Sequence, residues 1–277
     1  MTSATDRSAT DRSATDRTAL FHALHAPGPL VLPNAWDVAS ALIVEAAGAK
    51  AVATTSAGVA WSLGAPDGDA LDRDLAIGLV ARIAAAVGVP VTADIESGFG
   101  EDAAGVAETA KAVEEAGASG VNIEDGQGAA LRDVQEQRER LQAAREGGPT
   151  LYINARVDVF LRGIGEPKER LRHALDRARV YLEAGASGIF VPGVTDLETV
   201  ELLARNINAP LNVLAGPGAP AVRELGTAGA ARISVGTALA SAAYATAKKA
   251  AEELLAKGTY DSTGEGLGYG ELNALFR

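Results

Sequence analysis

Three β-branched runs of this chain end in polar pairs whose members are two positions apart. The pairs are Asp94 with Glu96, Asn122 with Glu124, and Asn154 with Arg156. Because side chains two positions apart on a strand point to the same face, each pair presents both polar groups to one side. The three pairs therefore predict a ring of carboxylates and amides around a single arginine.

The ligands that this ring offers are oxygen atoms, and the chain contains no cysteine. Mg²⁺ takes one or two carboxylates, keeps several waters and lets the substrate fill the remaining positions. We therefore predict a Mg²⁺ site at Asp94, Glu96 and Glu124, which Mn²⁺ could also fill. An arginine beside the ion would bind a carboxylate while the metal polarises a neighbouring oxo group, so the pattern indicates a small 2-oxo acid as ligand.

Simpler roles compete with some of these assignments. Arg156 could pair with Asp158 instead of contacting a substrate, and Asp94 could be a solvated strand end. Asp37 opens a predicted helix, where an N-cap role is as reasonable as a role in the site. Asp125 is either a cap or a metal ligand.

A repeated pattern shows which elements position the polar pairs. Helix endings rich in alanine and glycine lead directly into β-branched runs at 45–56, 114–125, 182–193 and 226–236. Further strand-like runs lie at 30–33, 89–96, 150–158 and 210–215. Eight strands that alternate with helical patterns predict an α/β fold, a closed parallel (β/α)8 TIM-type barrel. Active sites of such barrels form at the carboxyl ends of the strands, where the polar pairs lie.

The 277 residues divide into a tail, one barrel and an extension. Residues 1–17 repeat Ser-Ala-Thr-Asp-Arg three times and offer no apolar face, so we predict a disordered tail. Thr18 is a suitable cap for a short helix that runs to His25, and we expect the catalytic barrel to cover residues 18–257. Residues 258–277 form a glycine-rich C-terminal extension with a short apolar strip at 271–276.

The formal net charge of −11 argues against a surface for nucleic acid or anionic membranes, which would need clustered lysine and arginine. No apolar run approaches about 20 residues, and the N-terminus lacks the layout of a signal peptide. We therefore expect a cytoplasmic protein with no nucleic-acid or membrane partner. The absence of cysteine also excludes a thiol nucleophile or acid.

Several segments resemble the isocitrate lyase/phosphoenolpyruvate mutase superfamily in order and spacing. They are PNAWDVASALIVEAAGAKAVATTSAGVAWSLGAPDGD, VTADIESGFG, NIEDG, INARVD and NVLAGPG, and the similarity covers roughly residues 18–255. The resemblance implies that Asp94, Glu96 and Glu124 serve the Mg²⁺ site directly or through water. It also matches Asp67, in the loop after the second strand, to the catalytic aspartate of the family.

The resemblance further implies a substrate-binding set: Trp36, Ser56, Ala57, Gly58, Asp94, Arg156 and Asn212. Residues 56–58 and Arg156 would contact the substrate carboxylate, and Asn212 would lie near the far end of the substrate. We expect Trp36 to form a wall of the pocket, and we assign catalytic roles to Asp67, Glu124 and Arg156.

The chain departs from the family after the fourth strand. The lyase branches carry a lid there with a Lys-Lys/Arg-Cys-Gly-His signature, whose cysteine is the catalytic acid, whereas residues 126–132 of this chain read Gly-Gln-Gly-Ala-Ala-Leu-Arg. The phosphonomutase lid is not matched either, and Gly236-Thr237 stands where the decarboxylase-like branch carries a histidine. Without the lid thiol we expect weak lyase activity.

Three functions remain open. The first is a Mg²⁺-dependent lyase, similar to isocitrate lyase or 2-methylisocitrate lyase, that cleaves a carbon–carbon bond of a 2-oxo acid adduct such as a di- or tricarboxylate. The second is a mutase or hydrolase of the C–P bond of phosphonopyruvate or phosphoenolpyruvate, or an oxaloacetate decarboxylase. The third is a non-catalytic protein that binds a 2-oxo acid.

The segment after the eighth strand suggests assembly. Residues 241–257 read as an alanine-rich helix with Tyr244, Ala247, Ala251 and Leu254 along one face and a thin polar face. The resemblance implies that this eighth helix is exchanged between neighbouring barrels, which predicts a homodimer or homotetramer. The alternative is that the helix closes its own barrel.

Overall fold

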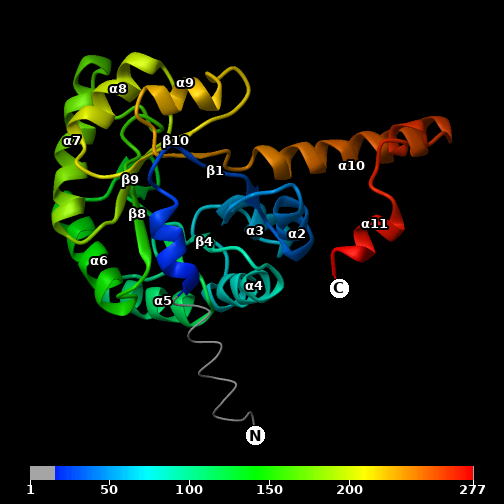
Figure 1. The fold of residues 1–277 in the computed structure, drawn as a ribbon, viewed down its shortest axis with the longest axis horizontal. Helices are drawn as coiled ribbons and strands as arrows, with labels where there is room; N and C mark the ends of the chain where they lie inside the picture. Colours follow the sequence, from blue (N-terminus) through cyan, green and yellow to red (C-terminus); the bar gives the residue numbers. More distant parts are fainter. Residues whose placement is uncertain (1–15, 277) are drawn as a thin grey trace, which may run out of the picture.

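A computed structural model describes residues 16–276 (Figure 1). Residues 1–15, which hold most of the predicted repeat tail, lie outside the described residues. Residues 16–23 are helical, so the first helix already includes Asp16 and Arg17, which we had assigned to the tail. Arg17 donates to the carbonyl oxygens of Ala84 (3.1 Å) and Val87 (3.3 Å), and these bonds tie the helix to the barrel.

The chain forms the predicted parallel barrel. Its strands are β1 (Leu30–Leu32) with β2 (Asn34–Ala35), β3 (Val52–Thr54), β4 (Val91–Asp94), β5 (Gly120–Glu124), β8 (Tyr152–Arg156), β9 (Gly188–Val191), β10 (Leu211–Leu214) and β11 (Arg232–Ser234). β1 pairs with β11 and β2 pairs with β3, so this first strand, interrupted at Pro33, closes the sheet. Each of the eight predicted strand regions contains one of these strands, which confirms the TIM-type fold.

Helices surround the sheet (Figure 1). They are α2 (Val38–Ala46), α3 (Ser56–Ser62), α4 (Arg73–Ala86), α5 (Ala103–Glu115), α6 (Val134–Gly147), α7 (Pro167–Glu183), α8 (Leu197–Asn206) and α9 (Val222–Thr227). A further helix, α10 (Ala238–Lys257), follows the last strand. After β5, an antiparallel hairpin of β6 (Gly126–Gln127) and β7 (Ala130–Leu131) occupies the segment predicted to be a shortened lid. Within residues 16–276, no helix combines the length and apolar character needed to cross a membrane.

The alanine- and glycine-rich repeat ends helices as the sequence predicts. Gly117 and Gly185 follow α5 and α7 with φ angles of 90° and 102°, in the left-handed region that favours glycine. The next strand begins three residues later in both cases. Each repeat therefore turns the chain from an outer helix into a buried strand.

The apolar core lies between the sheet and the helices, whereas the barrel interior is largely polar. Val121 and Ile123 of β5 point outward into the apolar core and are fully buried. The alternate residue Asn122 points inward and is also buried, as are Asn154 and Arg232. Buried polar side chains need hydrogen-bond partners. The partners of these side chains connect the barrel interior to the residues at the strand ends.

The N-terminal helix covers the amino ends of β5 and β8. Phe21 is fully buried there, and an added Cβ on Gly120 would lie 2.8 Å from its ring. The His25 ring stacks on Tyr152 with 3.9 Å between ring centroids. This aromatic cluster therefore closes the end of the barrel opposite the carboxyl ends of the strands.

The eighth helix, α10, projects away from the barrel (Figure 1). Ala240 is its one buried residue, while Leu254 and Leu255 near its far end are 54% and 87% exposed. Tyr244 lies near the rings of Trp36 and Trp61 of the same barrel, at centroid distances of 6.2 and 6.1 Å. Only the first turns of α10 pack on their own barrel, so the helix does not close it as the alternative required.

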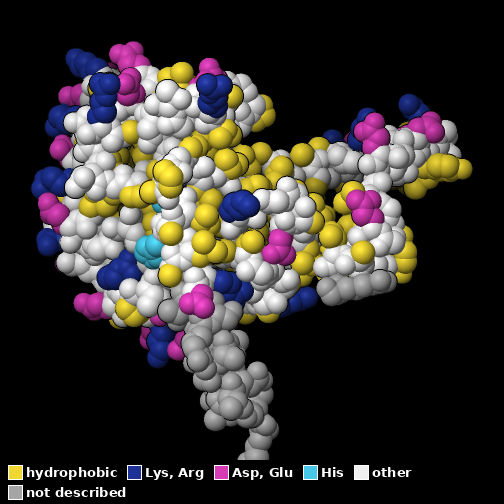
Figure 2. All heavy atoms as spheres, viewed as in Figure 1, with side chains coloured by type: hydrophobic (Ala, Val, Ile, Leu, Met, Phe, Trp, Pro, Cys, Tyr) yellow, Lys and Arg dark blue, Asp and Glu magenta, His cyan; other side chains and the backbone are white. Residues whose placement is uncertain are grey.

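The C-terminal extension folds back from the end of α10 through η1 (Asp261–Thr263) and α11 (Tyr269–Ala274). Glu253 holds its start by accepting from Thr259 Oγ1 (2.6 Å) and from the backbone of Asp261 (2.9 Å) and Ser262 (2.8 Å). Hydrophobic side chains lie exposed along α10 (Figure 2). Their exposure matters for assembly, because isolated soluble chains rarely leave such a helix uncovered.

Candidate active site

Asp94 occupies the carboxyl end of β4 and is held from three sides. Its backbone N–H donates to Thr54 Oγ1 (2.9 Å), its Oδ1 accepts from the backbone N–H of Glu96 (3.1 Å), and its Oδ2 accepts from Asn122 Nδ2 (3.2 Å). Each carboxylate oxygen keeps a free lone pair, since each accepts one of these bonds. The carboxylate is therefore oriented and still able to bind a cation.

Glu96 lies in the turn after β4 and adopts φ of 52°, which is unusual for a residue other than glycine. Its carboxylate accepts from the backbone N–H of Asp69, while Asp69 Oδ1 accepts from Ser97 N at 3.3 Å. The loop that contains Asp67 and Asp69 thus clamps this turn. Strained backbone conformations that surrounding contacts hold in place are common at functional sites, where a side chain needs a fixed orientation.

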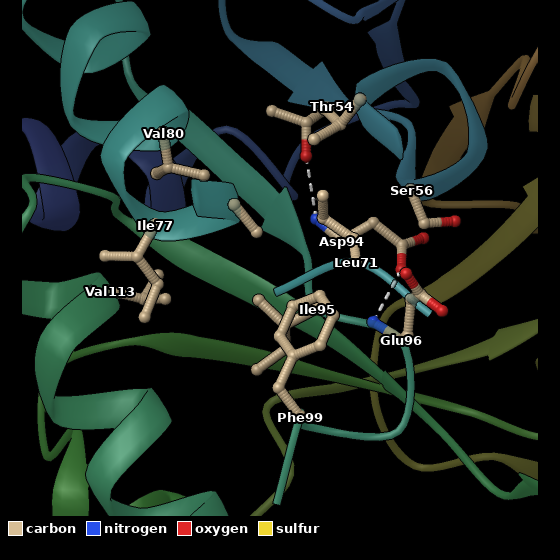
Figure 3. A pocket seen from close by; sticks show the side chains of 12 residues that line it. Thr54, Ser56, Leu71, Ile77, Val80, Asp94, Ile95, Glu96, Phe99 and Val113 are labelled. Carbon is tan, nitrogen blue, oxygen red and sulfur yellow. Dashed lines mark hydrogen bonds between the residues drawn. The ribbon is translucent and has the colours of Figure 1, made fainter. Parts of the chain in front are cut away.

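Asp94 and Glu96 share one cavity with Ser56 (Figure 3). The two carboxylates point toward one another and toward the Ser56 hydroxyl, and apolar side chains such as Ile77 and Val80 line the opposite side. The structure therefore brings together predicted metal and substrate residues from β4 and from the start of α3.

Burial of the acidic groups raises their pKa values. The pKa of Glu96 is raised to about 7, mainly by burial, which the hydrogen bond from the Asp69 backbone opposes and the nearby carboxylates of Asp69, Asp67 and Asp94 reinforce. The pKa of Asp94 is also raised by burial, although the Arg156 charge and the Asn122 hydrogen bond oppose this shift. These like charges lie close together, an arrangement that a bound cation would relieve.

Glu124, Arg156, Asp158 and Arg162 form an ion network at the ends of β5 and β8. Arg156 binds Glu124 Oε2 through Nη1 (2.5 Å) and Asp158 through Nε (2.6 Å) and Nη2 (2.9 Å). Arg162 Nε binds Asp158 Oδ2 (3.0 Å), and its Nη2 lies 3.5 Å from Glu124 Oε1. The pairing of Arg156 with Asp158, one of the two alternatives, is present, and a substrate would have to share or displace its contact with Glu124.

Burial also controls protonation in this network. Burial raises the pKa of Glu124 to about 8 in spite of the neighbouring Arg156 charge. Burial lowers the pKa of Arg156, but Glu124 and Asp158 more than offset this and hold it above the ordinary arginine value. Glu124 can therefore carry a proton near neutral pH, whereas Arg156 stays charged.

The hairpin of residues 126–131 lies beside this network. Arg162 donates to the carbonyl oxygen of Gly128, and an added Cβ on Gly126 would lie within van der Waals overlap of the Arg162 guanidinium. A side chain at 126 would therefore have to displace the Arg162 guanidinium from its present position beside Glu124. The hairpin carries no thiol, as the sequence indicates.

Asp37 and Asp125 have the structural roles that the sequence left open or did not foresee. Asp37 caps α2 and accepts from Ser40 N at 2.7 Å. Asp125 is fully buried and accepts from the Asp158 backbone (2.8 Å) and from Tyr181 Oη (2.8 Å). Asp125 is neither a helix cap nor exposed to the cavity. Its bond to the Asp158 backbone instead holds the segment that carries Asp158 in place.

The predicted carboxylate-binding segment begins α3. An added Cβ on Gly58 would lie 2.7 Å from Thr55 Cγ2 and 2.8 Å from Trp36 Cβ, so this position admits only glycine. Trp36 therefore packs against the segment. The Ala57 side chain is buried.

Asn212 lies deeper than a substrate contact would. It is 1% exposed, its Oδ1 accepts from Asn154 Nδ2 (3.0 Å), and its Nδ2 donates to Ser234 Oγ (3.1 Å). Its amide thus belongs to an internal chain of asparagines beneath the cavity. A direct role at the far end of a substrate would require these bonds to open.

Sequence reasoning missed Asp69, Arg162 and Arg232 as parts of the site. Asp69 was visible as the second acid of the Asp-Gly-Asp segment beside Asp67. Arg232 alternates with Ser234 on the last strand, a period-2 pattern that indicates an inward side chain. No comparable signal marked Arg162, because a loop determines its direction.

The donor set fits a hard cation, but not as three direct protein ligands. Among residues 16–276, no group of three or more His, Cys, Asp or Glu side chains is arranged to hold a metal ion. Glu124 faces Arg156, whereas Asp94 and Glu96 face the cavity. An ion at Asp94 would reach the other two carboxylates through water, which agrees with the hydration that Mg²⁺ retains in proteins.

Comparison with known proteins identifies relatives of this arrangement. The family model of phosphoenolpyruvate phosphomutase matches residues 21–255. An uncharacterised protein of Mycobacterium tuberculosis is 39% identical over 83% of this chain and 87% of its own length. The 2-methylisocitrate lyase of Salmonella typhimurium is 32% identical over 68% of this chain and 70% of its own. A solved structure from Burkholderia cenocepacia, assigned as a lyase or mutase, is 36% identical with a TM-score of 0.88 and covers 95% of this chain and 97% of its own.

Proposed function

This chain belongs to the phosphoenolpyruvate phosphomutase family, within the isocitrate lyase/phosphoenolpyruvate mutase superfamily, and we propose that it is a Mg²⁺-dependent carbon–carbon lyase for a small 2-oxo acid adduct. The observation that carries the proposal is the convergence of the Asp94 and Glu96 carboxylates with Ser56 at the strand ends, around a small cavity. Relatives that bear the name 2-methylisocitrate lyase support the reaction class.

Asp94 would hold the ion directly, and Glu96 and Glu124 would hold its waters. Mg²⁺, or Mn²⁺ in its place, would supply a Lewis acid that stabilises the negative charge on the oxygen of the substrate hydroxyl, which becomes the 2-oxo group of the product. The carboxylate of the substrate would bind the chain at residues 56–58 and at Arg156. Trp36 would exclude water from one side of the pocket.

Two carboxyl groups would move the protons. In the cleavage direction, a base accepts the proton of the substrate hydroxyl as the carbon–carbon bond breaks, and an acid protonates the carbon that departs. Asp67 suits the base, because it lies in the same loop as Asp69 and close to the carboxylates of Asp94 and Glu96. Glu124 suits the acid, because burial raises its pKa to about 8 in spite of its ion pair with Arg156, which brings its proton transfer near neutral pH.

The first test is a substrate panel with added Mg²⁺: 2-methylisocitrate, phosphonopyruvate and oxaloacetate. We expect cleavage of the first at a rate about 10² to 10⁴ below that of a relative with a lid cysteine, since general acid catalysis contributes about this much. Coupled detection of the 2-oxo acid product measures the rate. Turnover equal to that of a cysteine-bearing relative would contradict this expectation and would show that another group serves as an efficient acid.

The panel also separates the competing functions. The name of the family model favours chemistry at a C–P bond, and release or rearrangement of phosphonopyruvate alone would establish that alternative. Decarboxylation of oxaloacetate alone would indicate a decarboxylase. Mg²⁺-dependent binding of the compounds without turnover would indicate a binding protein.

Mg²⁺ should stabilise the protein more at high pH than at low pH. The pKa values of Glu96 and Glu124, about 7 and about 8, lie above the ordinary 4.5, so the metal-free folded state retains protons that the unfolded state has released. Stability without metal therefore falls as pH rises from 4.5 towards 8. Because Mg²⁺ needs ionised carboxylates, its binding displaces these protons and strengthens with pH.

Thermal unfolding with saturating Mg²⁺ or with EDTA measures this effect. We expect the rise in Tm on adding Mg²⁺ to be larger at about pH 8 than at about pH 5.5, where protons compete for the site. An equal rise at both pH values would show that the ion binds elsewhere than at these carboxylates.

We also propose a homodimer or homotetramer in which α10 packs on a neighbouring barrel. The exposure of Leu254 and Leu255 at the far end of α10 supports this, because the helix has an uncovered apolar face and leaves its own barrel.

A further inference from the structure

Arg232 of β11 is a buried cation without a carboxylate partner. Its side chain points into the barrel interior and is 1% exposed. Nη2 donates to Asn122 Oδ1 (3.1 Å), while Nε and Nη1 have no hydrogen-bond partner among the described residues. Burial lowers the pKa of Arg232 to about 10, so the side chain remains charged at neutral pH.

An arrangement of this kind is costly for stability. A buried charge is normally paired with an opposite charge, and unpaired charges are among the most destabilising groups in a protein interior. An apolar side chain of similar length would fill the same space at lower cost. The position of Arg232 therefore calls for a role other than packing.

The contact with Asn122 supplies such a role. Asn122 Oδ1 accepts from both Arg232 Nη2 and Asn154 Nδ2 (2.9 Å), so the oxygen of this amide must face the barrel interior. The Asn122 Nδ2 group is then left to face Asp94, and it donates to Asp94 Oδ2 at 3.2 Å. If the Asn122 amide were flipped, its Nδ2 group would face the donors of Arg232 and Asn154. Asp94 would then lose the donor that it has now.

The arginine charge also strengthens this donor. A cation bound to the amide oxygen polarises the amide and makes its N–H groups better donors, as in other hydrogen-bond chains in a low dielectric. The Phe21 ring lies 5.9 Å from Arg232 Cζ and Tyr152 lies nearby, but neither ring touches the Asn122 amide in the described hydrogen bonds. The Asp94 carboxylate also lies within electrostatic range of Arg232, so the arginine charge acts on Asp94 through space as well as through the amide.

We propose that Arg232 is a positioning residue of the metal site, which fixes the Asn122 amide and thereby orients the Asp94 carboxylate for a divalent cation. The inference rests on the proposed function, since it assumes that Asp94 binds the ion. Partners that orient a metal ligand from behind typically contribute about 10- to 100-fold to metal affinity. The competing role is structural, in which Arg232 only packs beneath the barrel floor.

Mn²⁺ affinity, measured by electron paramagnetic resonance of the free ion, tests the proposal without any assay of turnover. We expect Arg232→Met to bind Mn²⁺ about 10-fold more weakly than the wild type. Phe21→Leu is the matched control, because it loosens the packing around Arg232 without touching the amide chain. It should lower Tm and leave Mn²⁺ affinity unchanged.

Asn122→Leu shows whether Arg232 acts through the amide. In that background the additional Arg232→Met change should cause no further loss of Mn²⁺ affinity, because the residue that transmits the effect is gone. Additive losses would overturn the proposal, and so would wild-type affinity in folded Arg232→Met. If Arg232→Met does not fold, Arg232→Lys serves as the test variant, since its shorter ammonium retains the charge but not the planar fork of the guanidinium. Wild-type affinity in that variant would also overturn the proposal.

A wild-type protein that binds no Mn²⁺ would instead refute the proposed function, and the inference with it. Wild-type binding that is unaffected by Arg232 would refute the inference alone.

Discussion

Asp94→Asn should remove Mg²⁺-dependent activity and ligand binding while leaving the protein folded. The amide keeps the size of the side chain and an oxygen that can accept from the backbone of Glu96, as Asp94 does now. It removes a buried negative charge that lies close to Asp67 and Arg156. Since a direct ligand contributes more than the about 10- to 100-fold of an outer partner, we expect Mg²⁺ affinity to fall by at least about 100-fold.

Titration calorimetry with Mg²⁺ and unfolding with and without the ion measure both consequences. The Tm of metal-free Asp94→Asn should stay close to that of the wild type, because removing a charge that burial and the Asp67 carboxylate disfavour offsets the loss of the hydrogen bond from Asn122. Asp196→Asn is a suitable control, since this exposed aspartate caps α8 and does not line the cavity. Unchanged Mg²⁺ affinity in Asp94→Asn would sink the assignment of the metal site.

The barrel could be predicted because its signals are local. A helix that ends in Gly117 or Gly185 and a β-branched run that begins three residues later are both properties of a short segment. Eight such units leave few alternatives to a closed parallel sheet. The strand-end rule then located Asp94 and Glu96, whose side chains do share one cavity.

The contacts between loops could not be predicted in this way. The clamp of Asp69 on Glu96 and the reach of Arg162 to Glu124 depend on the paths of two irregular segments, which follow from packing and not from periodicity. The same limit applies to the partner of Glu124. The strand pattern grouped Glu124 with the other carboxylates, whereas in the structure it pairs with Arg156. Strand register fixed its position, whereas its partner depended on the loop after β8.

Arg232 and Asn212 show a further limit. The resemblance placed Asn212 near the far end of a substrate, and the sequence reading did not single out Arg232, yet both side chains are 1% exposed and lie in the interior. Depth along a strand depends on the stagger between neighbouring strands, which sequence alone does not give. The interior of a barrel can also hold a polar layer if each amide finds a partner, as Asn154 does with Asn122 and Asn212.

Deletion of residues 238–277 should convert the oligomer into unstable, largely monomeric barrels. Ala240 is the one buried residue of α10 among the described residues, so in the proposed exchanged oligomer the neighbouring subunit would cover the apolar side chains at its far end. The deletion would also uncover Trp36 and Trp61, which lie near Tyr244. Sedimentation equilibrium at micromolar concentration would report the loss of mass, and unfolding would report the lower Tm.

A point variant separates loss of the interface from damage to the barrel. Leu255→Glu places a charge on a side chain that is 87% exposed in a single chain, so it should leave a monomer folded but dissociate an exchanged oligomer. Lys248→Glu, on the polar face where Lys248 pairs with Glu252 at 3.3 Å, is the control and should not dissociate it. An oligomer that survives both the deletion and Leu255→Glu would place the interface elsewhere, and a wild-type monomer would exclude obligate exchange. Dissociation by Leu255→Glu alone, with the barrel still folded, is the result that exchange of α10 requires.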